Sequence, residues 1–559
     1  MAEKEEDDIK ERSADDLFKD FKAVSITEFF RKNKTHLGYS GKLRSLTTVI
    51  HELVTNSLDA CEEAGILPEI DVAVKQLGEE HYSFSCRDNG PGIPEKHIGG
   101  VFGQMLAGTK FHRNVQLRGQ QGIGVAGVTL FSQMTTGKPI KILTGTGDGK
   151  VYEVKLMVDV TKNNAEILET NVINQKWRGT EIHGELKGVT FNLGERSPYE
   201  YIRRTAIANP HLKISFTDPE GRKSVFDRTS KEVPKPPKEM KPHPKGMDTD
   251  DIINRAKQSK SRTIAGFLEN EFSRVSKAKA DEIQAKVKFD LKKSPRKIVW
   301  GEAEELAKAF GDLDFMAPSV EGLRPIGERQ IENAVMKILK PEFYSVVTRN
   351  PTVYGGGIPF QIEVAIAFGG HAGREVQGGE EGESTRVEVM RFANRTPLLF
   401  DAGGCAITEA VNSVDWKRYD MKDFESTPIT IFVNLISMYV PYTSAGKQSV
   451  SGEEEIVKEI RMALMDVGRK FHRFHSKMRR AIEREARMHA LMKYSAELAI
   501  AVARLTGRDA KKLSKALQDL ITHKLKIEMK ALEKEEAELD LQEEGEKRRK
   551  KEKEESEED

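Results

Sequence analysis

The chain has 559 residues, 32% of them charged, and its 89 Lys and Arg nearly balance its 88 Asp and Glu. This length leaves room for several domains, while the near-zero net charge excludes general attraction to nucleic acid, although local patches could still bind phosphate. No apolar run approaches the ~20 residues of a membrane span, the start MAEKEEDDIKER is unlike a signal peptide, and the three cysteines contain no CxxC pair, so we expect a cytoplasmic protein without disulfides.

An aromatic-rich arm, residues 1–40, precedes the most informative segment, HELVTNSLDAC at 51–61. This segment places Glu52, Asn56 and Asp59 at i, i+4 and i+7, on one stripe of a helix whose apolar residues can pack on a sheet. Taken alone, such a polar stripe is more often a solvated helix face than a site.

Two glycine loops follow this helix along the chain. HYSFSCRDNGPGIP, at 81–94, reads as a strand that carries Asp88 to a turn at Gly90 and Gly92, where glycine allows close backbone approach. RGQQGIGVAG, at 118–127, precedes an apolar stretch that reads as a helix start. Free amide groups and the helix dipole at such a start favour phosphates. Helix stripe, turn and loop in this order predict a nucleotide site.

Together these motifs resemble the GHKL ATPases, the superfamily of gyrase, Hsp90, histidine kinases and MutL, with WRGTEIHGEL at 177–186 as the fourth motif. The resemblance implies that Glu52 is the general base for the attacking water and that Asn56 ligates Mg²⁺. It also implies that Asp88 accepts a hydrogen bond from adenine. The ATP-binding residues it implies are Asn56, Asp59, Asp88, Gly90, Gly92, Thr109, Lys110, Gly119, Gln120, Gln121, Gly122, Ile123, Gly124, Val125, Ala126, Thr180 and Lys447.

Lys110 has two interpretations, since GQMLAGTKF at 103–111 would bring Thr109 and Lys110 near the phosphates, but a solubilising lysine fits the pattern equally well. Further on, the proline-rich KEVPKPPKEMKPHPKG at 231–246 marks a domain boundary. The basic helical stretch 248–297 after it is either a solvated surface or one that faces phosphates.

Strand patterns return at 361–368, 385–394 and 429–437, which are rich in β-branched and aromatic residues. PYTSAGKQSV, at 441–450, then presents Lys447 on a glycine turn before a long helical region. A lysine on a turn is commonly surface charge. In GHKL proteins with a transducer domain, however, a lysine from that domain reaches the γ-phosphate, and the resemblance implies this role for Lys447.

The order of motifs, with RGQQGIG, RFANRTPLLFD and VDWKRYDM, resembles the B subunits of archaeal DNA topoisomerase VI. The resemblance implies an α+β fold with a GHKL (Bergerat) sandwich, a helix-two-turn-helix insert, a ribosomal-protein S5 type transducer and a helical stalk. The corresponding bounds are 1–40 for the arm, 41–228 for the ATPase domain, 229–305 for the insert, 306–460 for the transducer, 461–530 for the stalk and 531–559 for a charged tail.

In function, the resemblance implies an ATP-hydrolysing topoisomerase subunit that works with ATP and Mg²⁺. It implies dimerisation of two B subunits on ATP binding, an A2B2 heterotetramer with the DNA-cleaving A subunit, and double-stranded DNA as partner. Trp416, Lys417 and Tyr419 are the DNA contacts it implies, with a buried structural Trp416 as the alternative. A chaperone, a histidine kinase, a gyrase-type subunit and a MutL-type scaffold fit the domain order less well.

Overall fold

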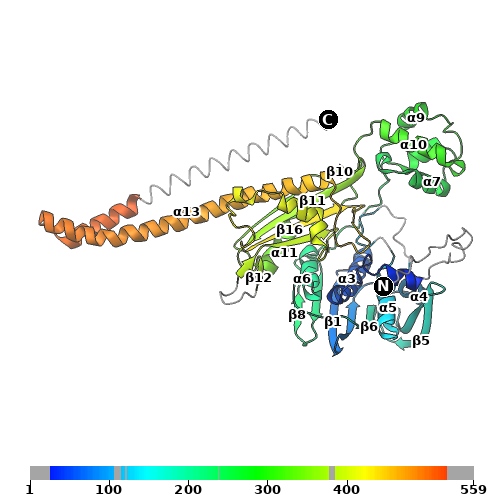
Figure 1. Cartoon of the computed structure of the whole chain (residues 1–559), viewed down its shortest axis with the longest axis horizontal. Coiled ribbons are helices and arrows are strands. Elements are labelled where there is room, and N and C mark those ends of the chain that lie inside the picture. Colours follow the sequence, from blue (N-terminus) through cyan, green and yellow to red (C-terminus); the bar gives the residue numbers. More distant parts are fainter. Residues whose placement is uncertain (1–25, 106–114, 120–121, 237, 377–383, 525–559) are drawn as a thin grey trace, which may run out of the picture. The chain divides into compact units, whose positions relative to one another are not determined.

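The structure is a computed structural model that describes residues 26–105, 115–119, 122–236, 238–376 and 384–524 (Figure 1). It divides into one unit that ends at Phe471 and a second that begins at His472. Four of the predicted site residues and the predicted charged tail lie outside the described residues: Thr109, Lys110, Gln120, Gln121 and 531–559.

An eight-stranded sheet forms the N-terminal part of the first unit, in the order β5-β4-β3-β6-β2-β1-β7-β8. All neighbouring strands are antiparallel except the parallel pair β1 and β7. The strands are β1 (Glu69–Gly78), β2 (His81–Asp88), β3 (Ile140–Thr146), β4 (Lys150–Asp159), β5 (Asn164–Asn174), β6 (Arg178–Lys187), β7 (Lys213–Thr217) and β8 (Lys223–Phe226).

Helices cover one face of this sheet. Ile70, Val72 and Val74 alternate with exposed or half-buried residues along β1, which is the two-residue period of a strand with one buried face. They share a core with Leu46 and Ile50 of the helix that carries the predicted stripe. The helices of this layer are α2 (Ile26–Lys32), α3 (Lys42–Glu63), α4 (Glu95–Gly103), α5 (Gly124–Thr136) and α6 (Pro198–Ala208).

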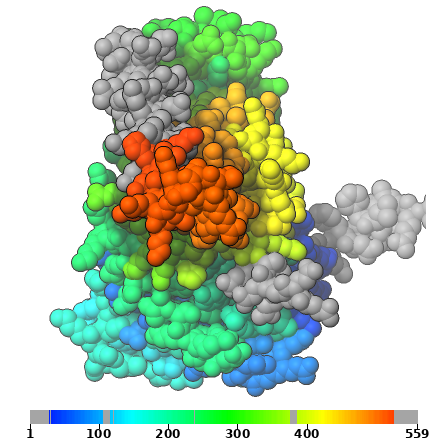
Figure 2. All heavy atoms as spheres, turned by 90° about the vertical axis from the view of Figure 1, so that its left-hand side faces the viewer, coloured from blue at the N-terminus to red at the C-terminus, as the bar shows by residue number. Residues whose placement is uncertain are grey.

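The strand β5 lies at the edge of the sheet, and its side chains are exposed along almost its whole length. Its cyan residues lie at the surface in Figure 2. The core of this layer is therefore under the central strands, where β2 ends at the predicted glycine turn.

A small helical module with its own core follows the proline-rich segment. Asp248, Thr263 and Ser276 each accept a hydrogen bond from a first-turn backbone N–H, which explains where three of its helices begin. The expected boundary at 305 falls inside its last helix. The elements are η1 (Pro244–Gly246), α7 (Thr249–Gln258), α8 (Ile264–Glu271), α9 (Lys277–Lys286), η2 (Pro295–Lys297) and α10 (Trp300–Asp312).

A second sheet has the order β10-β11-β16-β14-β15, with β9 paired to β11, and β14 runs parallel to β16. A short ladder of two strands, β12 (Arg374–Val376) and β13 (Ser384–Arg386), stands beside it. The strands of the sheet are β9 (Phe343–Thr348), β10 (Thr352–Tyr354), β11 (Ile358–Phe368), β14 (Glu388–Ala393), β15 (Thr396–Pro397) and β16 (Ile429–Ser437).

Both faces of this sheet are covered, which explains why β11 and β16 are nearly continuous apolar runs. Ile362 and Val364 belong to a core shared with α12 and the start of α13, whereas Ala365 and Ala367 belong to one shared with α11. Ile207 of α6 also belongs to this second core. The remaining elements are α11 (Glu328–Leu339), η3 (Ala402–Gly404), α12 (Ala406–Asn412), η4 (Trp416–Tyr419) and α13 (Glu454–Thr506).

The long helix α13 starts inside the second sheet's core, with Ile456, Ile460 and Leu464 buried, so the expected boundary at 460 lies within it. In the second unit it continues to Thr506, and a further helix spans 510–524. None of the described helices combines the length and apolar character needed to cross a membrane. The α+β class predicted from the sequence is confirmed.

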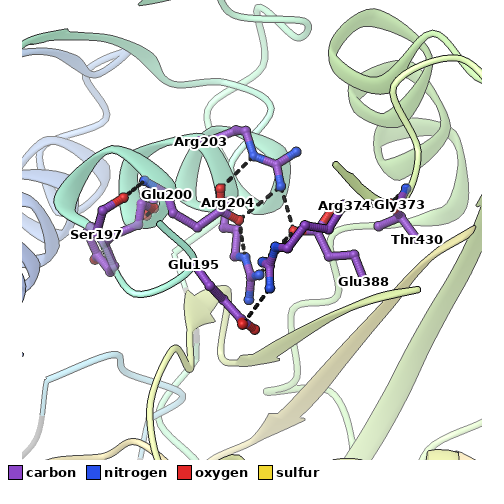
Figure 3. Close-up of polar contacts among 11 residues, drawn as sticks. Glu195, Ser197, Glu200, Arg203, Arg204, Gly373, Arg374, Glu388 and Thr430 are labelled. Atoms are coloured by element: carbon purple, nitrogen blue, oxygen red, sulfur yellow. Dashed lines mark hydrogen bonds and ion pairs between the residues drawn. The ribbon is translucent and has the colours of Figure 1, made fainter. Parts of the chain in front are cut away.

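A cluster of ion pairs joins α6 to β14 (Figure 3). The carboxylate of Glu388 lies 2.6 Å from Nη2 of Arg203 and 3.0 Å from Nη2 of Arg204, and Arg374 approaches it to 3.5 Å. Glu200 pairs with the first two arginines from within the helix. Arg204 and Glu388 are 1% and 2% exposed, so their charges depend on each other rather than on water.

Replacing Glu388 by Gln should destabilise the first unit, because the buried Arg204 and the half-buried Arg203 and Arg374 would keep their charges and lose one of the carboxylates that balance them. We expect the free energy of unfolding to fall by about 3–5 kcal/mol. The control is Glu169→Gln, which breaks an exposed pair with Lys155 and should cost at most about 1 kcal/mol. Thermal and denaturant unfolding of both variants would test this, and equal effects would contradict it.

Candidate active site

A cavity of about 570 Å³ opens between α3, the glycine turn, α4, the start of α5 and a loop after the second sheet. It is large enough for a small ligand of nucleotide size. The lining residues are Leu37, Tyr39, His51, Glu52, Thr55, Asn56, Gly92, Ile93, Pro94, His97, Gly100, Val101, Gln104, Arg118, Gly119, Gly122, Ile123, Gly124, Val125, Ala126, Ala445 and Lys447.

The predicted helix stripe contributes two of its three members to this cavity. Nδ2 of Asn56 donates to the carbonyl of Glu52 at 2.6 Å, which directs the amide oxygen away from the helix backbone. Asp59, predicted with them, instead pairs with Nη1 of Arg118 at 2.8 Å and lines a separate cavity of about 270 Å³. The stripe therefore lines two separate cavities, with Glu52 and Asn56 in one and Asp59 in the other.

Asp88 lies at the end of β2 and accepts three hydrogen bonds. The donors are Ser57 Oγ at 2.9 Å, the N–H of Gly90 at 2.9 Å and the N–H of Thr180 at 3.1 Å. Burial raises the pKa of this carboxyl, and the three hydrogen bonds oppose that shift. The result is a fixed acceptor whose orientation is set from α3, the turn and β6.

Sequence reasoning missed two hydroxyl groups that fix this corner. One is Ser57, which directly follows Asn56 in the helix and bonds Asp88. The other is Thr144 of β3, whose Oγ1 accepts from the N–H of Ile93 at 2.9 Å and lies 3.2 Å from Oγ1 of Thr180. The sequence offers no signal for Thr144, because it lies in a strand outside every motif.

Two glycines are required by close backbone approach. Gly92 has φ of +76°, and a Cβ there would lie 2.0 Å from the carbonyl oxygen of Gly145. A Cβ on Gly124 would lie 2.2 Å from Oε2 of Glu52. Gly124 begins α5, and no side chain caps the helix at Ile123. The first turn of α5 therefore reaches Glu52 closely and lacks a side-chain acceptor, which is the arrangement that binds anions.

Arg118, at the stem of the second glycine loop, anchors that loop to α3. Its guanidinium bonds Asp59 and Glu62 at 2.8 Å and Asn209 at 2.6 Å while it is 8% exposed. Burial would raise the pKa of Glu62, but Arg118 and His211 lower it well below its usual range. The stem of the loop is thus held by ion pairs whose groups stay charged. The glycine motif in the sequence does not indicate these ion pairs.

Lys447 enters the cavity from the loop after the second sheet. A bridge between Tyr442 and Val450 closes this loop, and Lys447 has a left-handed backbone with φ of +51°. Its Nζ donates to the carbonyl of Arg118 at 3.2 Å. The structure therefore brings Lys447 and Glu52, which are far apart in the chain, to one cavity.

His51 lies behind Glu52 and stacks on Tyr201 with ring centroids 5.1 Å apart. Burial lowers its pKa and Lys447 acts in the same direction, while Glu52 opposes them. The ring is therefore neutral near pH 7 and adds no second cation beside Lys447.

The three predicted DNA contacts lie away from this cavity. Trp416 is 5% exposed, stacks on Phe424 at 4.7 Å and donates its indole N–H to the carbonyl of Val411, and Tyr419 is buried in the same core. Their rings are structural, as in the alternative interpretation of Trp416. Lys417 is exposed, and its contact with DNA stays a prediction.

A metal ion here would depend on few protein ligands. Within the described part of the chain, no group of three or more His, Cys, Asp or Glu side chains could hold a metal ion. The amide oxygen of Asn56 and the carboxylate of Glu52 lie one helical turn apart at the cavity wall. Such a sparse set suits Mg²⁺, which usually keeps several waters and takes further ligands from phosphates.

Comparison with known proteins agrees with this geometry. Residues 41–160 match the family model of histidine kinase-, DNA gyrase B- and HSP90-like ATPases, and residues 318–487 match that of the topoisomerase VI B subunit transducer. The chain is 46% identical to the B subunit of type 2 DNA topoisomerase 6 from Pyrococcus horikoshii over 94% of this chain and 99% of the relative. It is 48% identical to the protein of that name from Methanothermobacter thermautotrophicus over 93% and 98%. The predicted resemblance is confirmed.

Substituting Gly124 by Ala should displace the Glu52 carboxylate without unfolding the protein, because the clash is with the end of a flexible side chain and Ala favours a helix. We expect ATP hydrolysis to fall by about 10²-fold, the scale of a 1 Å misplacement. Gly311→Ala in α10, where a Cβ would meet nothing within 4 Å, is the control. Unchanged hydrolysis in Gly124→Ala, at an unchanged melting temperature, would contradict the assignment.

Proposed function

The chain belongs to the family of B subunits of type 2 DNA topoisomerase 6, and on that premise we propose that it binds ATP in the cavity beside Glu52 and hydrolyses it to gate the passage of one DNA duplex through another. One observation carries the proposal. Glu52, the uncapped start of α5 and Lys447 line the same cavity, although three separate segments supply them.

The orientation of the nucleotide follows from the charges around the cavity. The triphosphate lies toward the first turn of α5, where N–H groups and the helix dipole favour negative charge. Adenine lies toward Asp88, whose carboxylate is held ready to accept a hydrogen bond. Gly92 lets the turn after Asp88 pack directly on the backbone of β3.

Glu52 acts as the general base that orients and deprotonates the attacking water. Asn56 and Glu52 are one helical turn apart, which aims both side chains at the same end of the cavity. The amide oxygen of Asn56 would hold Mg²⁺, which neutralises phosphate charge when bound. Phosphoryl transfer needs positioning and charge neutralisation more than covalent help, and these residues provide both.

Lys447 couples hydrolysis to the second sheet. Its ammonium group now contacts the carbonyl of Arg118, at the stem of the glycine loop, and a terminal phosphate at the start of α5 would offer it a stronger, charged partner. When that phosphate is lost, Lys447 again donates to the uncharged carbonyl of Arg118. The loop and the sheet that carries it would then change position with the state of the nucleotide.

The proposed partners are a DNA-cleaving A subunit, a second copy of this chain on ATP binding, and double-stranded DNA, in an A2B2 heterotetramer. The name of the relatives supports the A subunit and DNA. Lys417 is the exposed residue proposed to contact the DNA backbone. On this proposal the chain alone hydrolyses ATP, and the complex alone transports DNA.

The test is ATP-dependent decatenation of linked DNA circles by this chain with an A subunit. Each subunit alone should be inactive in decatenation. Glu52→Ala should still bind ATP, lose hydrolysis by about 10²–10⁴-fold and fail to turn over. Full decatenation without ATP, or with the Glu52→Ala protein, would contradict the proposal.

Lys447→Ala should weaken binding of ATP but not of ADP, because ADP lacks the phosphate that Lys447 contacts. The ratio of ATP-analogue to ADP affinity should fall about tenfold or more, on the scale of a charge-assisted hydrogen bond. Lys447→Arg should not restore it fully, since a planar guanidinium does not replace a compact ammonium. Calorimetry with Lys458→Ala, a lysine near the start of α13, gives the control. An unchanged ratio would refute the role.

A further inference from the structure

The hydroxyl group of Tyr39 is buried and has no hydrogen-bond partner among the described residues. The side chain is 4% exposed, and its ring is held between Phe30 at 5.1 Å and Phe131 at 4.9 Å. The backbone N–H of Tyr39 donates to the carbonyl of Lys34 at 2.8 Å. Ring and backbone are therefore fixed, and the hydroxyl cannot reach water by a rotamer change without losing this packing.

The side chain of Tyr39 forms part of the wall of the proposed nucleotide cavity, with its hydroxyl buried just behind the surface. Tyr39 lines that cavity together with Glu52 and the start of α5. A Cβ built on Gly127, in the first turns of α5, would lie 3.3 Å from the hydroxyl oxygen. The hydroxyl of Tyr39 therefore lies beside the first turn of α5 and within the influence of the Glu52 charge.

A buried hydroxyl without a partner costs free energy, and native proteins rarely leave such a group unmatched unless a ligand or a catalytic role accounts for it. Burial, together with the charge of Glu52, raises the pKa of Tyr39 well above its ordinary value. The phenol therefore keeps its proton and is a donor. Its natural partner is an oxygen atom that carries negative charge.

We infer that the Tyr39 hydroxyl donates a hydrogen bond to an oxygen of the terminal phosphate when ATP fills the cavity. The inference rests on the proposed function and adds a ligand-contacting residue from the segment before α3. Phosphate oxygen is the acceptor that fits best, because the first turn of α5 favours an anion at this place. With Lys447, the terminal phosphate would then be contacted from the N-terminal segment and from the second sheet.

The test variant is Tyr39→Phe, which removes one oxygen atom and keeps the ring. In the absence of nucleotide its melting temperature should be equal to or higher than that of the native protein, because the unmatched hydroxyl is gone. Affinity for a non-hydrolysable ATP analogue, measured by calorimetry with Mg²⁺, should fall about tenfold or more, and affinity for ADP should stay the same. Tyr82→Phe, in the same core but away from the cavity, is the control.

The outcomes are distinct. A lower melting temperature for Tyr39→Phe without nucleotide would reveal a structural partner and overturn the inference. Equal loss of ATP-analogue and ADP affinity, or slower hydrolysis with both affinities unchanged, would move the hydroxyl away from the terminal phosphate and overturn it as well. If the native protein and Tyr82→Phe also fail to bind ATP, the proposed function itself is wrong.

Discussion

The ion pairs of Glu388 are the constraint on which the arrangement of the first unit depends. Several guanidinium groups converge on one buried carboxylate, and Glu200 supplies a second negative charge within the same cluster. Such a cluster holds its geometry because each charge, once removed from water, is stable only beside the others. It fixes α6 against β14, and α6 in turn packs on α3, which carries Glu52. The position of Glu52, the proposed general base, is thus tied to the second sheet.

The proposed nucleotide site lies at this junction rather than within one layer. Glu52 and Asn56 line the cavity from the first layer, and Lys447 lines it from a loop of the second. Asp88 is not among the lining residues and is held beside the turn by Ser57 of α3. Arg118 joins the two, since its side chain is bound to α3 and its carbonyl accepts from Lys447. A change in the contacts of Lys447 would therefore act on both layers through Arg118.

Short-range patterns made the centre of the site predictable. The spacing of Glu52 and Asn56 and the glycine turns specify local geometry, which neighbours in the chain largely determine. The resemblance to known B subunits located Lys447. Asp59 shows the limit of prediction from local patterns. It shares the stripe with Glu52, but it lies about 10 Å further along α3, where it forms an ion pair with Arg118. This ion pair joins residues 59 positions apart in the chain, so no local sequence pattern predicts it. The burial of Trp416 is equally hard to predict from local sequence, because it depends on Phe424 and on the core of the second sheet.

Helix α6 contributes residues to the cores of both sheets, and this affects which fragments of the protein can fold. Its residues Ile207 and Ala208 are fully buried in the core of the second sheet, whereas Tyr201 and Ile202 are buried in that of the first. An N-terminal fragment that ends near residue 228, the domain boundary expected from the sequence, would expose this apolar face to solvent. It would also leave Arg203 and Arg204 without Glu388. Such a fragment is expected to aggregate, so soluble pieces of the first unit should retain the second sheet.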